Sequence, residues 1–521
     1  MRIYKGSILT CDKEDNVYRY LIEKEGKILF VGNTLPDYAK DKKIIDMKNN
    51  ALIPTFADTH SHFASYAVLA NALFVDKATS VDEIKNMLKK ADKEMKSNKT
   101  LIAFGLNPTK LKEKRLVNKQ DIDEVAKDRN VIIITADGHS VVINTKVLDK
   151  LPKKIQTIRG YDFESGIIKH EAFYEVVDFL PKLLKKSDIL KYMQNAIDTL
   201  ISKGIGLVDA ASGTGFPGDL DVDLIKWIAR GQQNGFQMRI FFQTFDVTKV
   251  KKRGFTRLGG CFKAALDGSI GSGDAALNEP YNNKEDKGIL FYSDEEVYEN
   301  FKAAHLDNLQ ISVHAIGDAA FDQATRTLKR VLDENPKKDH RHGIIHASLP
   351  TEEGLKICRD YDIQIFAQFS FIDVSGALFD PMYKALGDRV YAAEPYRKMV
   401  DYGIKVSAGS DAPVTMPDPI LWLYNACNNP NEKNRLTIKE ALKICTYNGY
   451  FATFDEKQRG SLEKGKWADM VMLSQNPYSV KVNNLNTLKV LKTYLKGKAY
   501  APENNNTLKT LIKGILSKDK C

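Results

Sequence analysis

The sequence predicts an α/β protein built on a (β/α)8 TIM barrel, in which eight parallel strands alternate with helices. Short apolar runs bounded by turn residues alternate with segments of helical periodicity, which is the pattern of repeated strand–helix units. Histidines and an aspartate follow several of these runs, at the strand ends where barrels carry their functional groups. The predicted strands are 52–63, 206–211, 237–245, 261–266, 311–316, 343–348, 363–369 and 404–408.

Both ends of the chain contain short strand patterns that lie outside this barrel. Residues 1–50 hold apolar stretches separated by turn signals such as Glu25-Gly26, and a similar pattern returns at 468–473 and 490–494. Chain ends often lie close together in space. We therefore expect residues 1–50 and 455–500 to form one small β-sandwich-like domain, which leaves 51–454 for the barrel.

An inserted lobe is expected at about 76–200, after the first barrel strand. About 140 residues separate the first two predicted strands, which is too many for one loop of a strand–helix unit. Within this stretch, Ser80-Val-Asp-Glu83 fits a helix capping box, and an apolar strand pattern follows at 131–135. Since barrel enzymes vary in these loops, the lobe is expected to cover the active site.

The last segment, 501–521, predicts a short helix docked on the body of the protein. Five apolar residues recur between lysines at helical spacing: Leu508, Leu511, Ile512, Ile515 and Leu516. A basic helix on a membrane surface is the alternative, and five apolar side chains give it little membrane affinity.

Composition narrows the class of protein. Of 521 residues, 43% are hydrophobic and 28% charged, and the net charge of +10 is spread along the chain among Asp and Glu rather than gathered in one basic segment. We therefore expect no nucleic-acid partner and, without a long apolar run, no membrane partner. The six cysteines are far apart with no CxxC pair, which favours reduced thiols and a cytoplasmic protein.

Four histidines and one aspartate form the strongest chemical signal. His60 and His62 stand two apart at the end of the first predicted strand, so both face one side and can reach one metal ion. His314, His346 and Asp411 each follow a later predicted strand. Any one of these histidines alone would be better explained as a hydrogen-bonded core residue. Together, at the ends of separate strands, the five predict a metal centre.

These motifs resemble the amidohydrolase superfamily and, within it, the YtcJ-like (amidohydrolase family 3) metal-dependent hydrolases. The resemblance covers roughly residues 1–500. The matching stretches are Ile53-Pro-Thr-Phe-Ala-Asp-Thr-His-Ser-His62, Asp137-Gly-His-Ser140, Asp267-Gly-Ser-Ile-Gly-Ser272, Val313-His-Ala-Ile-Gly-Asp318, Arg341-His-Gly-Ile-Ile-His346, Gly409-Ser-Asp-Ala-Pro413 and Gly460-Ser-Leu-Glu-Lys-Gly465.

The resemblance implies a centre of two divalent ions, of which Zn²⁺ is the first expectation. It implies that Lys263, at the end of the fourth strand, carries a CO₂-derived carbamate that bridges them; the residues alone favour a lysine that extends from a strand end into solvent. One ion is then held by His60, His62, Lys263 and Asp411, and the other by Lys263, His314 and His346. His139 is the candidate substrate contact from the lobe, with a structural role as the alternative.

By the same resemblance, the reaction is hydrolysis of a C–N bond in a small amide, formamide or cyclic amide. A metal-bridging hydroxide attacks the carbonyl carbon, and Asp411 acts as general base and then returns the proton to the leaving nitrogen. The expected partner is this small-molecule substrate, with a homodimer as the assembly to test.

Some residues depart from the family pattern. Gly273-Asp274 replaces a usual Arg-Thr, which affects substrate recognition, and Ile345 replaces a usual Glu. A mononuclear deaminase of the same superfamily is one alternative, but such enzymes carry a Glu three residues after the strand-five histidine, where this chain has Gly317. A non-catalytic scaffold is the other alternative, although such proteins usually lose metal ligands.

Overall fold

The computed structural model describes residues 1–96, 99–136, 140–214, 216–232, 234–372, 379–502 and 507–517. It divides into two compact units. One comprises Met1–His62, Ile197–Ser212 and Leu224–Cys521, and the other comprises Phe63–Ala196 and Gly213–Asp223.

The first unit contains an eight-stranded, parallel and nearly closed barrel sheet, which confirms the predicted α/β barrel. Seen from β5, each strand pairs with the next one along the chain, and the last strand returns to the first: Thr59 Oγ1 donates to the Ala408 carbonyl at 2.9 Å. The strands are β5 (Phe56–Ser61), β11 (Ile205–Ser212), β12 (Gln237–Phe242), β13 (Arg257–Ala265), β14 (Gln310–Ala315), β15 (Gly343–His346), β16 (Gln364–Ala367) and β17 (Val406–Ala408).

The first predicted strand is two strands in the structure. The stretch 52–63 contains the end of β4 (Ile44–Pro54) and all of β5, and the two belong to different sheets. The chain changes partner at Thr55: its N–H donates to the Asp469 carbonyl, whereas the next N–H, of Phe56, donates to Gly204. An uninterrupted apolar run cannot reveal such a change of partner.

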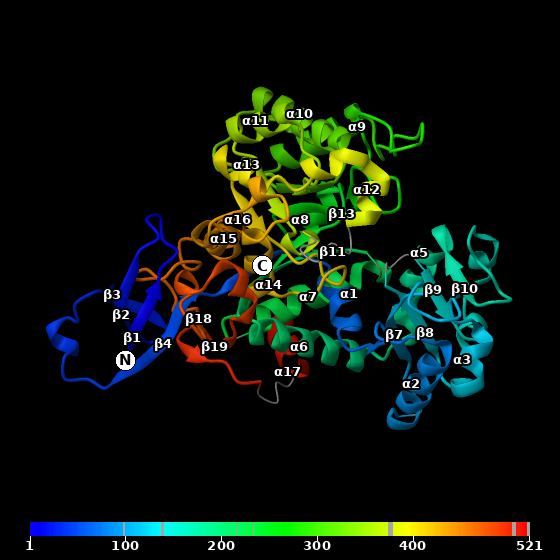
Figure 1. Ribbon diagram of the computed structural model, residues 1–521, viewed down its shortest axis with the longest axis horizontal. Coiled ribbons are helices and arrows are strands. Elements are labelled where there is room, and N and C mark those ends of the chain that lie inside the picture. Colours follow the sequence, from blue (N-terminus) through cyan, green and yellow to red (C-terminus); the bar gives the residue numbers. More distant parts are fainter. Residues whose placement is uncertain are drawn as a thin grey trace. The chain divides into compact units, whose positions relative to one another are not determined.

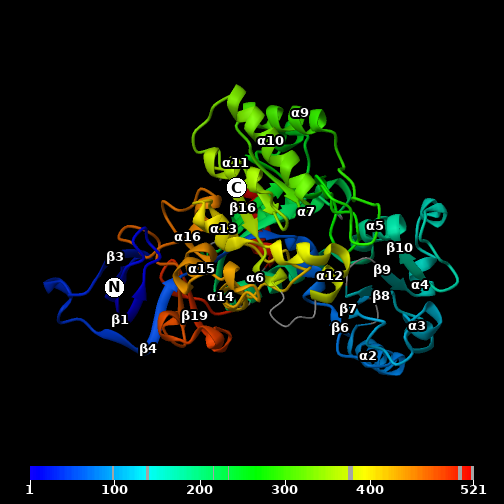
Figure 2. The same cartoon turned by 45° about the horizontal axis from the view of Figure 1, so that its top comes forward.

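Amphipathic helices of this unit cover the barrel, and α9, α10 and α11 lie side by side on it (Figures 1 and 2). In α10, residues Phe321, Ala324, Leu328 and Val331 recur at helical spacing and are all buried. The bounds are α8 (Val247–Lys252), α9 (Asp294–Leu306), α10 (Asp318–Glu334), α11 (Glu352–Asp360), α12 (Phe379–Leu386), α13 (Tyr396–Asp401), α14 (Pro419–Cys427), α15 (Ile438–Cys445), α16 (Tyr447–Ala452) and α17 (Thr507–Leu516).

A second sheet of this unit combines strands from both parts of the chain, and its blue and red strands are visible in Figure 1. Its centre is β4, which pairs in parallel with β1 and antiparallel with β18. The order is β20 (Lys498–Ala499), β19 (Val490–Leu495), β18 (Met470–Leu473), β4, β1 (Arg2–Leu9), β2 (Val17–Lys24) and β3 (Lys27–Gly32). The boundaries 1–50 and 455–500 and the sandwich-like form of this domain stay predictions.

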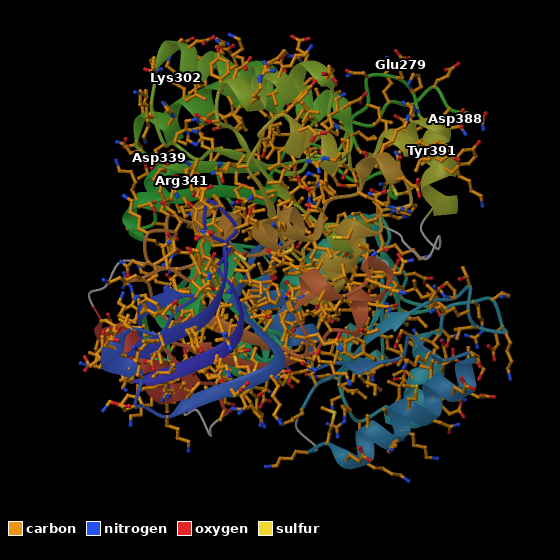
Figure 3. The ribbon with its side chains drawn as sticks, turned by 60° about the vertical axis from the view of Figure 1, so that its left-hand side comes forward. Glu279, Lys302, Asp339, Arg341, Asp388 and Tyr391 are labelled. Carbon is orange, nitrogen blue, oxygen red and sulfur yellow. The ribbon has the colours of Figure 1, made fainter. Side chains whose placement is uncertain are left out.

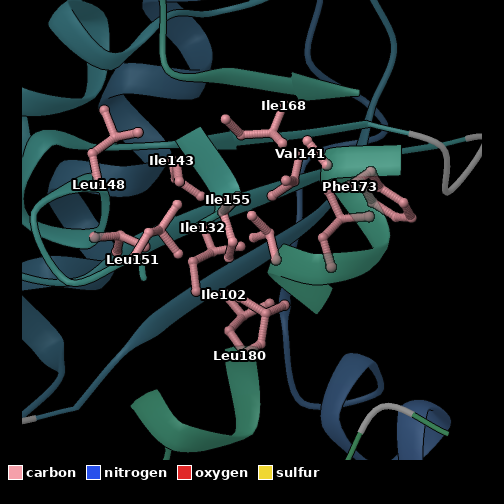
Figure 4. Packing of buried hydrophobic residues seen from close by; sticks show 14 of the residues in the cluster. Ile102, Ile132, Val141, Ile143, Leu148, Leu151, Ile155, Ile168, Phe173 and Leu180 are labelled. Atoms are coloured by element: carbon pink, nitrogen blue, oxygen red, sulfur yellow. The ribbon is translucent and has the colours of Figure 1, made fainter. Parts of the chain in front are cut away.

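The second unit is built on a five-stranded mixed sheet with an apolar cluster of its own (Figure 4). Ser80 begins α2 by accepting the Glu83 N–H at 3.2 Å, as the capping pattern predicts. The strands are β6 (Leu73–Phe74), β7 (Leu101–Leu106), β8 (Val131–Thr135), β9 (Ser140–Ile143) and β10 (Ile167–Lys169). The helices are α1 (Phe63–Leu69), α2 (Val81–Glu94), α3 (Lys119–Ala126), α4 (Thr145–Leu148) and α5 (His170–Phe179).

Two helices, α6 (Lys186–Ser202) and α7 (Leu220–Gly231), each include residues of both units. Within the first unit, Gly514 of α17 closely approaches the backbone of Trp227 in α7, so the predicted tail helix has a docking place there. Of the helices that the structure describes, none has both the length and the apolar character needed to cross a lipid bilayer.

Candidate metal centre

Two histidines come from the end of β5. His60 lies on the strand and His62 directly follows it, and both side chains are buried. Their ring centroids are 5.2 Å apart, with the ring planes at 80°. Asp58 of the same strand accepts hydrogen bonds from the N–H and the hydroxyl of Ser410 at 2.8 and 2.6 Å. These bonds fix the end of β5 against the segment that follows β17.

Asp411 reaches the two histidines because the chain after β17 continues along β5. The Asp411 N–H donates to the His60 carbonyl at 2.7 Å, and the His62 N–H donates to the Ala412 carbonyl at 2.8 Å. This pairing sets Asp411 Oδ1 3.1 Å from His60 Nε2 and 3.2 Å from His62 Nε2. Closure of the barrel therefore assembles this part of the site.

His314 and His346 come from the ends of β14 and β15. Their ring centroids are 4.6 Å apart, and the His346 ring lies 5.6 Å from that of His60. His346 has a φ of +71°, a conformation that is uncommon for a residue other than glycine and that is typically found at functional sites. The structure thus brings the four predicted histidines and Asp411 together at the C-terminal ends of the strands.

A neighbouring amide orients the His346 ring, and a carboxylate lies close to the His314 ring. His346 Nδ1 lies 2.7 Å from Gln368 Oε1, so Nδ1 carries the proton and Nε2 faces the cluster with its lone pair. His314 Nδ1 lies 3.2 Å from Asp267 Oδ1. Asp267 is itself held by the N–H groups of Ile316 and Gly317 at 3.0 and 2.7 Å.

Burial and neighbouring groups shift the pKa values of His60, His346 and Asp411 toward the protonation states that bind metals. Burial lowers the pKa of His60 and lowers that of His346 well below its usual value, where the nearby His314 acts in the same direction. Burial opposes the ionisation of Asp411, but the His60 and His62 nitrogens beside it hold its pKa well below the usual value. Neutral imidazoles and an ionised carboxylate are the metal-binding forms.

The donor set fits a divalent ion of the first transition row. His60, His62 and Asp411 offer three ligand atoms that all lie within 4.8 Å of one another. Two N or O ligands at zinc-like bond lengths and a tetrahedral angle are about 3.3 Å apart, close to the 3.1 and 3.2 Å observed. Asp411 Oδ1 is buried and has no hydrogen bond of normal geometry to any described residue, so a cation would complete its surroundings.

Lys263 is placed differently from the other predicted ligands. It lies on β13 with an exposed side chain, whereas the five residues above are buried. Cys261, two residues earlier, is buried, and its Sγ lies 3.4 Å from His60 Nε2. In its unmodified form Lys263 therefore does not fit the centre as the other residues do. His139, the predicted substrate contact, lies outside the described residues.

Three further histidines lie near β14 and β15 but away from this cluster. His305, His340 and His342 hydrogen-bond to one another or to backbone near the N-terminal ends of β14 and β15. These hydrogen bonds place them apart from the candidate metal ligands.

Sequence reasoning missed Gln368, Asp58 and Cys261. Asp58 carried a signal, because it precedes His60 by two residues and so shares its face of the strand. The other two carried none: Gln368 belongs to no motif, and the direction of the Cys261 side chain depends on a local distortion of β13.

Comparison with known proteins agrees with this geometry. The chain is similar to the putative amidohydrolase YtcJ of Bacillus subtilis (strain 168), at 26% identity over 483 residues that cover 87% of this chain and 89% of that protein. It is also similar to an N-substituted formamide deformylase of Arthrobacter pascens, at 22% identity over 540 residues that cover 95% and 97%.

The fold recurs in solved structures. An uncharacterized metal-dependent hydrolase from Pyrococcus horikoshii OT3 superposes with a TM-score of 0.75 at 23% identity, over 92% of this chain and 99% of that one. A sequence profile described as "Amidohydrolase family" matches residues 43–500. The chain therefore belongs to the amidohydrolase family, as the resemblance to YtcJ-like proteins predicts.

Proposed function

We propose that the protein hydrolyses a C–N bond of a small amide, formamide or cyclic amide. The observation that carries this proposal is the convergence of two histidine pairs and Asp411 at the C-terminal ends of the barrel strands. The similarity to an N-substituted formamide deformylase supports this substrate class.

Each residue has a defined part in the proposed reaction. His60, His62 and Asp411 would hold one divalent ion, Zn²⁺ first, and His314 and His346 a second. A bound ion supplies a Lewis acid that polarises the carbonyl and lowers the pKa of water. Asp411, kept ionised by its neighbours, accepts the proton of the attacking water and passes it to the leaving nitrogen.

The bridging ligand that the resemblance implies does not match the observed position of Lys263. A carbamate on Lys263 would need this exposed side chain to turn inward and become buried. The proposal for hydrolysis does not depend on it, since the five buried residues already offer the histidine and carboxylate donors of a catalytic metal site.

The deaminase alternative is disfavoured by the packing of Gly317. A Cβ atom at this position would lie 1.9 Å from the Ala276 carbonyl oxygen, and its N–H donates to Asp267 at 2.7 Å. The proton-shuttling glutamate that deaminases carry there has no room in this backbone. The scaffold alternative predicts neither bound metal nor turnover.

The test is a screen of the metal-loaded protein against N-formyl, N-acyl and cyclic-imide compounds, with metal content measured in parallel. Once a substrate is found, Asp411→Asn is expected to lower kcat by about 10²–10⁴-fold, as removal of a general base does. Asp360→Asn, on the surface beside Arg359, is the control and should keep normal turnover. Undiminished turnover in Asp411→Asn would contradict the proposed role. If the protein binds no metal and turns over none of the three compound classes, the result would favour the non-catalytic scaffold.

A further inference from the structure

The backbone of β13 is distorted where it passes the histidine cluster. Gly259 and Gly260 have φ values of +116° and +107°, and a Cβ on Gly259 would lie 1.8 Å from the Ser312 carbonyl oxygen. The pairing with β14 then jumps, from Gly260 opposite Val313 to Ala265 opposite His314. The extra residues form a bulge, and bulges often redirect a side chain beside an active site.

This bulge directs the thiol of Cys261 into the centre. The Cys261 N–H donates to Gln243 Oε1 at 3.0 Å, which holds the backbone in place. Phe262, with a φ of +51°, and Lys263 are exposed, whereas Cys261 is buried. The exposed Phe262 ring packs edge-on against His62, with ring centroids 5.1 Å apart. Cys261 is the bulge residue that places a buried metal-binding atom beside histidine nitrogens.

The distances around the sulfur match those between ligands of one metal ion. Cys261 Sγ lies 3.4 Å from His60 Nε2 and 3.9 Å from His346 Nε2, and the three atoms lie within 4.8 Å of one another. A thiolate and an imidazole on one tetrahedral zinc are about 3.6 Å apart. His346 Nδ1 is engaged by Gln368, so His346 presents Nε2 to the sulfur.

The sulfur also lies between the two halves of the centre. His60 belongs with His62 and Asp411 on one side, and His346 belongs with His314 on the other. A group in contact with both His60 and His346 occupies the place of a bridging ligand. A thiolate carries one negative charge, as a carbamate does, so it would balance the same positive charge.

We propose that Cys261 Sγ, rather than a carbamate on Lys263, is the ligand that β13 contributes to the metal centre, where it bridges the two ion positions. The thiol proton is released to solvent when the ion binds, because the thiolate is the ligand form. Lys263 is then a surface residue of the bulge. This inference rests on the proposed metal-dependent function and deepens it.

Cobalt binding tests the inference independently of any substrate. The metal-free protein is titrated with Co²⁺ while the visible spectrum and the near-ultraviolet sulfur-to-cobalt charge-transfer band are recorded, and bound cobalt is counted after gel filtration. The wild type is expected to show the charge-transfer band, and Cys261→Ser to lose it and bind cobalt about 10-fold or more weakly. Cys358→Ser changes another buried thiol, in α11, and should keep the band, as should Lys263→Ala.

The outcomes separate the inference from the proposed function. Stoichiometric cobalt without the band in the wild type, or a band that persists in Cys261→Ser, overturns the role of Cys261 and leaves the metal centre standing. Loss of bound metal in Lys263→Ala with retention in Cys261→Ser overturns it in favour of the carbamate. Failure of the wild type to bind cobalt overturns the metal centre and the inference together.

A second measurement uses only the wild-type protein, in case Cys261→Ser does not fold. In the ¹¹³Cd NMR spectrum of the cadmium-loaded protein, a sulfur ligand moves the resonance far downfield of the range for nitrogen and oxygen ligands. A downfield resonance supports the inference, and resonances confined to the nitrogen and oxygen range overturn it.

Discussion

Gln368 holds His346 in the orientation that the metal centre needs. Its Oε1 accepts the Nδ1 proton of His346 at 2.7 Å, and its Nε2 donates to the Phe366 carbonyl at 2.9 Å. Both groups are buried, so the amide cannot exchange its partners for water without cost. Such supporting hydrogen bonds fix the tautomer and ring orientation of metal-binding histidines.

Removal of this amide should weaken metal binding without removing a ligand. Gln368→Ala is expected to lower the affinity for Zn²⁺ by about 10–100-fold, the usual effect of losing such a partner. Competition with a coloured chelator measures the Kd. Gln120→Ala, which removes an exposed amide in α3, serves as the control, and an equal affinity in both variants would contradict the role of Gln368.

At the scale of single residues, the sequence predicts those whose position depends on strand order alone. His60, His62, His314, His346 and Asp411 follow apolar runs, and parallel strands bring their ends to one face. The Cys261 and Lys263 positions could not be predicted in this way. Their direction depends on the bulge after Gly259-Gly260, and a one-residue shift along a strand moves a side chain to the other face.

Three histidines at the opposite ends of β14 and β15 form one hydrogen-bonded chain. The Ile311 N–H donates to His342 Nδ1, so the His342 proton is on Nε2, which lies 2.9 Å from His305 Nδ1. His305 Nε2 in turn donates to the Asn335 carbonyl, and the His342 N–H donates to His340 Nδ1. If any of these rings took up a further proton, the new N–H group would face another hydrogen-bond donor.

This chain should make the protein less stable in acid. Burial lowers the pKa of His305 and His340, and lowers that of His342 well below its usual value. Because the folded-state pKa lies below the unfolded value of about 6.5, stability is complete above that pH. Below about pH 6.5, the free energy of unfolding decreases by about 1.4 kcal/mol per pH unit for a histidine that, like His342, stays neutral in the folded state.

Urea unfolding at pH 7.5 and 5.5 measures this dependence. His342→Gln should reduce the loss in free energy of unfolding between these two pH values, because glutamine cannot take up a proton. His170→Gln, which replaces an exposed histidine, should leave the decrease as it is in the wild type. An unchanged slope in His342→Gln would show that this chain does not control acid stability.

Arg341 joins the start of β15 to the segment after α16. Its guanidinium lies between the rings of Phe451 and Phe454, at 3.9 and 4.0 Å from their centroids, and makes two hydrogen bonds to Glu456 at 2.9 and 3.0 Å. Figure 3 labels Arg341 beside Asp339, which accepts a further bond at 2.6 Å. The planar fork is needed for all of these contacts.

Arg341→Lys keeps the charge but loses this geometry. We expect it to lower the free energy of unfolding by about 1.5–3 kcal/mol, the value of one hydrogen bond to a charged group. Arg330→Lys is the matched control, since Arg330 also bonds a glutamate but is half exposed, and should cost at most about 1 kcal/mol. Chemical denaturation compares the two, and equal costs would refute the argument.

At the scale of elements, the alternation of apolar runs and helical patterns was enough to predict all eight barrel strands, including short β17. It could not separate β4 from β5, because both are apolar and only the hydrogen-bonding partners change at Thr55. Nor could the pattern give the bulge in β13, which is a property of backbone conformation rather than of periodicity.

At the scale of the whole molecule, the candidate metal ligands and the apolar cluster of the second unit belong to different parts of the chain. All five buried site residues lie within the first unit, whereas Ile132 of β8 is fully buried in a cluster of the second unit (Figure 4). Stability of one unit can therefore be changed by substitutions that touch no residue of the site.

Ile132→Ala is expected to destabilise the second unit by about 2–5 kcal/mol, the usual cost of such a truncation in a core. Hydrogen exchange should then rise in peptides of β7, β8 and β9 and stay unchanged in peptides of β5, β14 and β15. Ile311→Ala, at an equally buried position of β14, should show the reverse pattern. A uniform rise throughout the chain in both variants would indicate one cooperative unit instead.

The pairing of β4 with β18 has a consequence for the nascent chain on the ribosome. More than 400 residues separate Pro54 from its partner Met470. At a translation rate of about 5–20 residues per second, the edge of β4 waits roughly 20–80 s for this partner. An unpaired strand edge is a template for association with other chains. Slow or interrupted translation should therefore expose this protein to aggregation through a strand that the finished molecule conceals at the centre of a sheet.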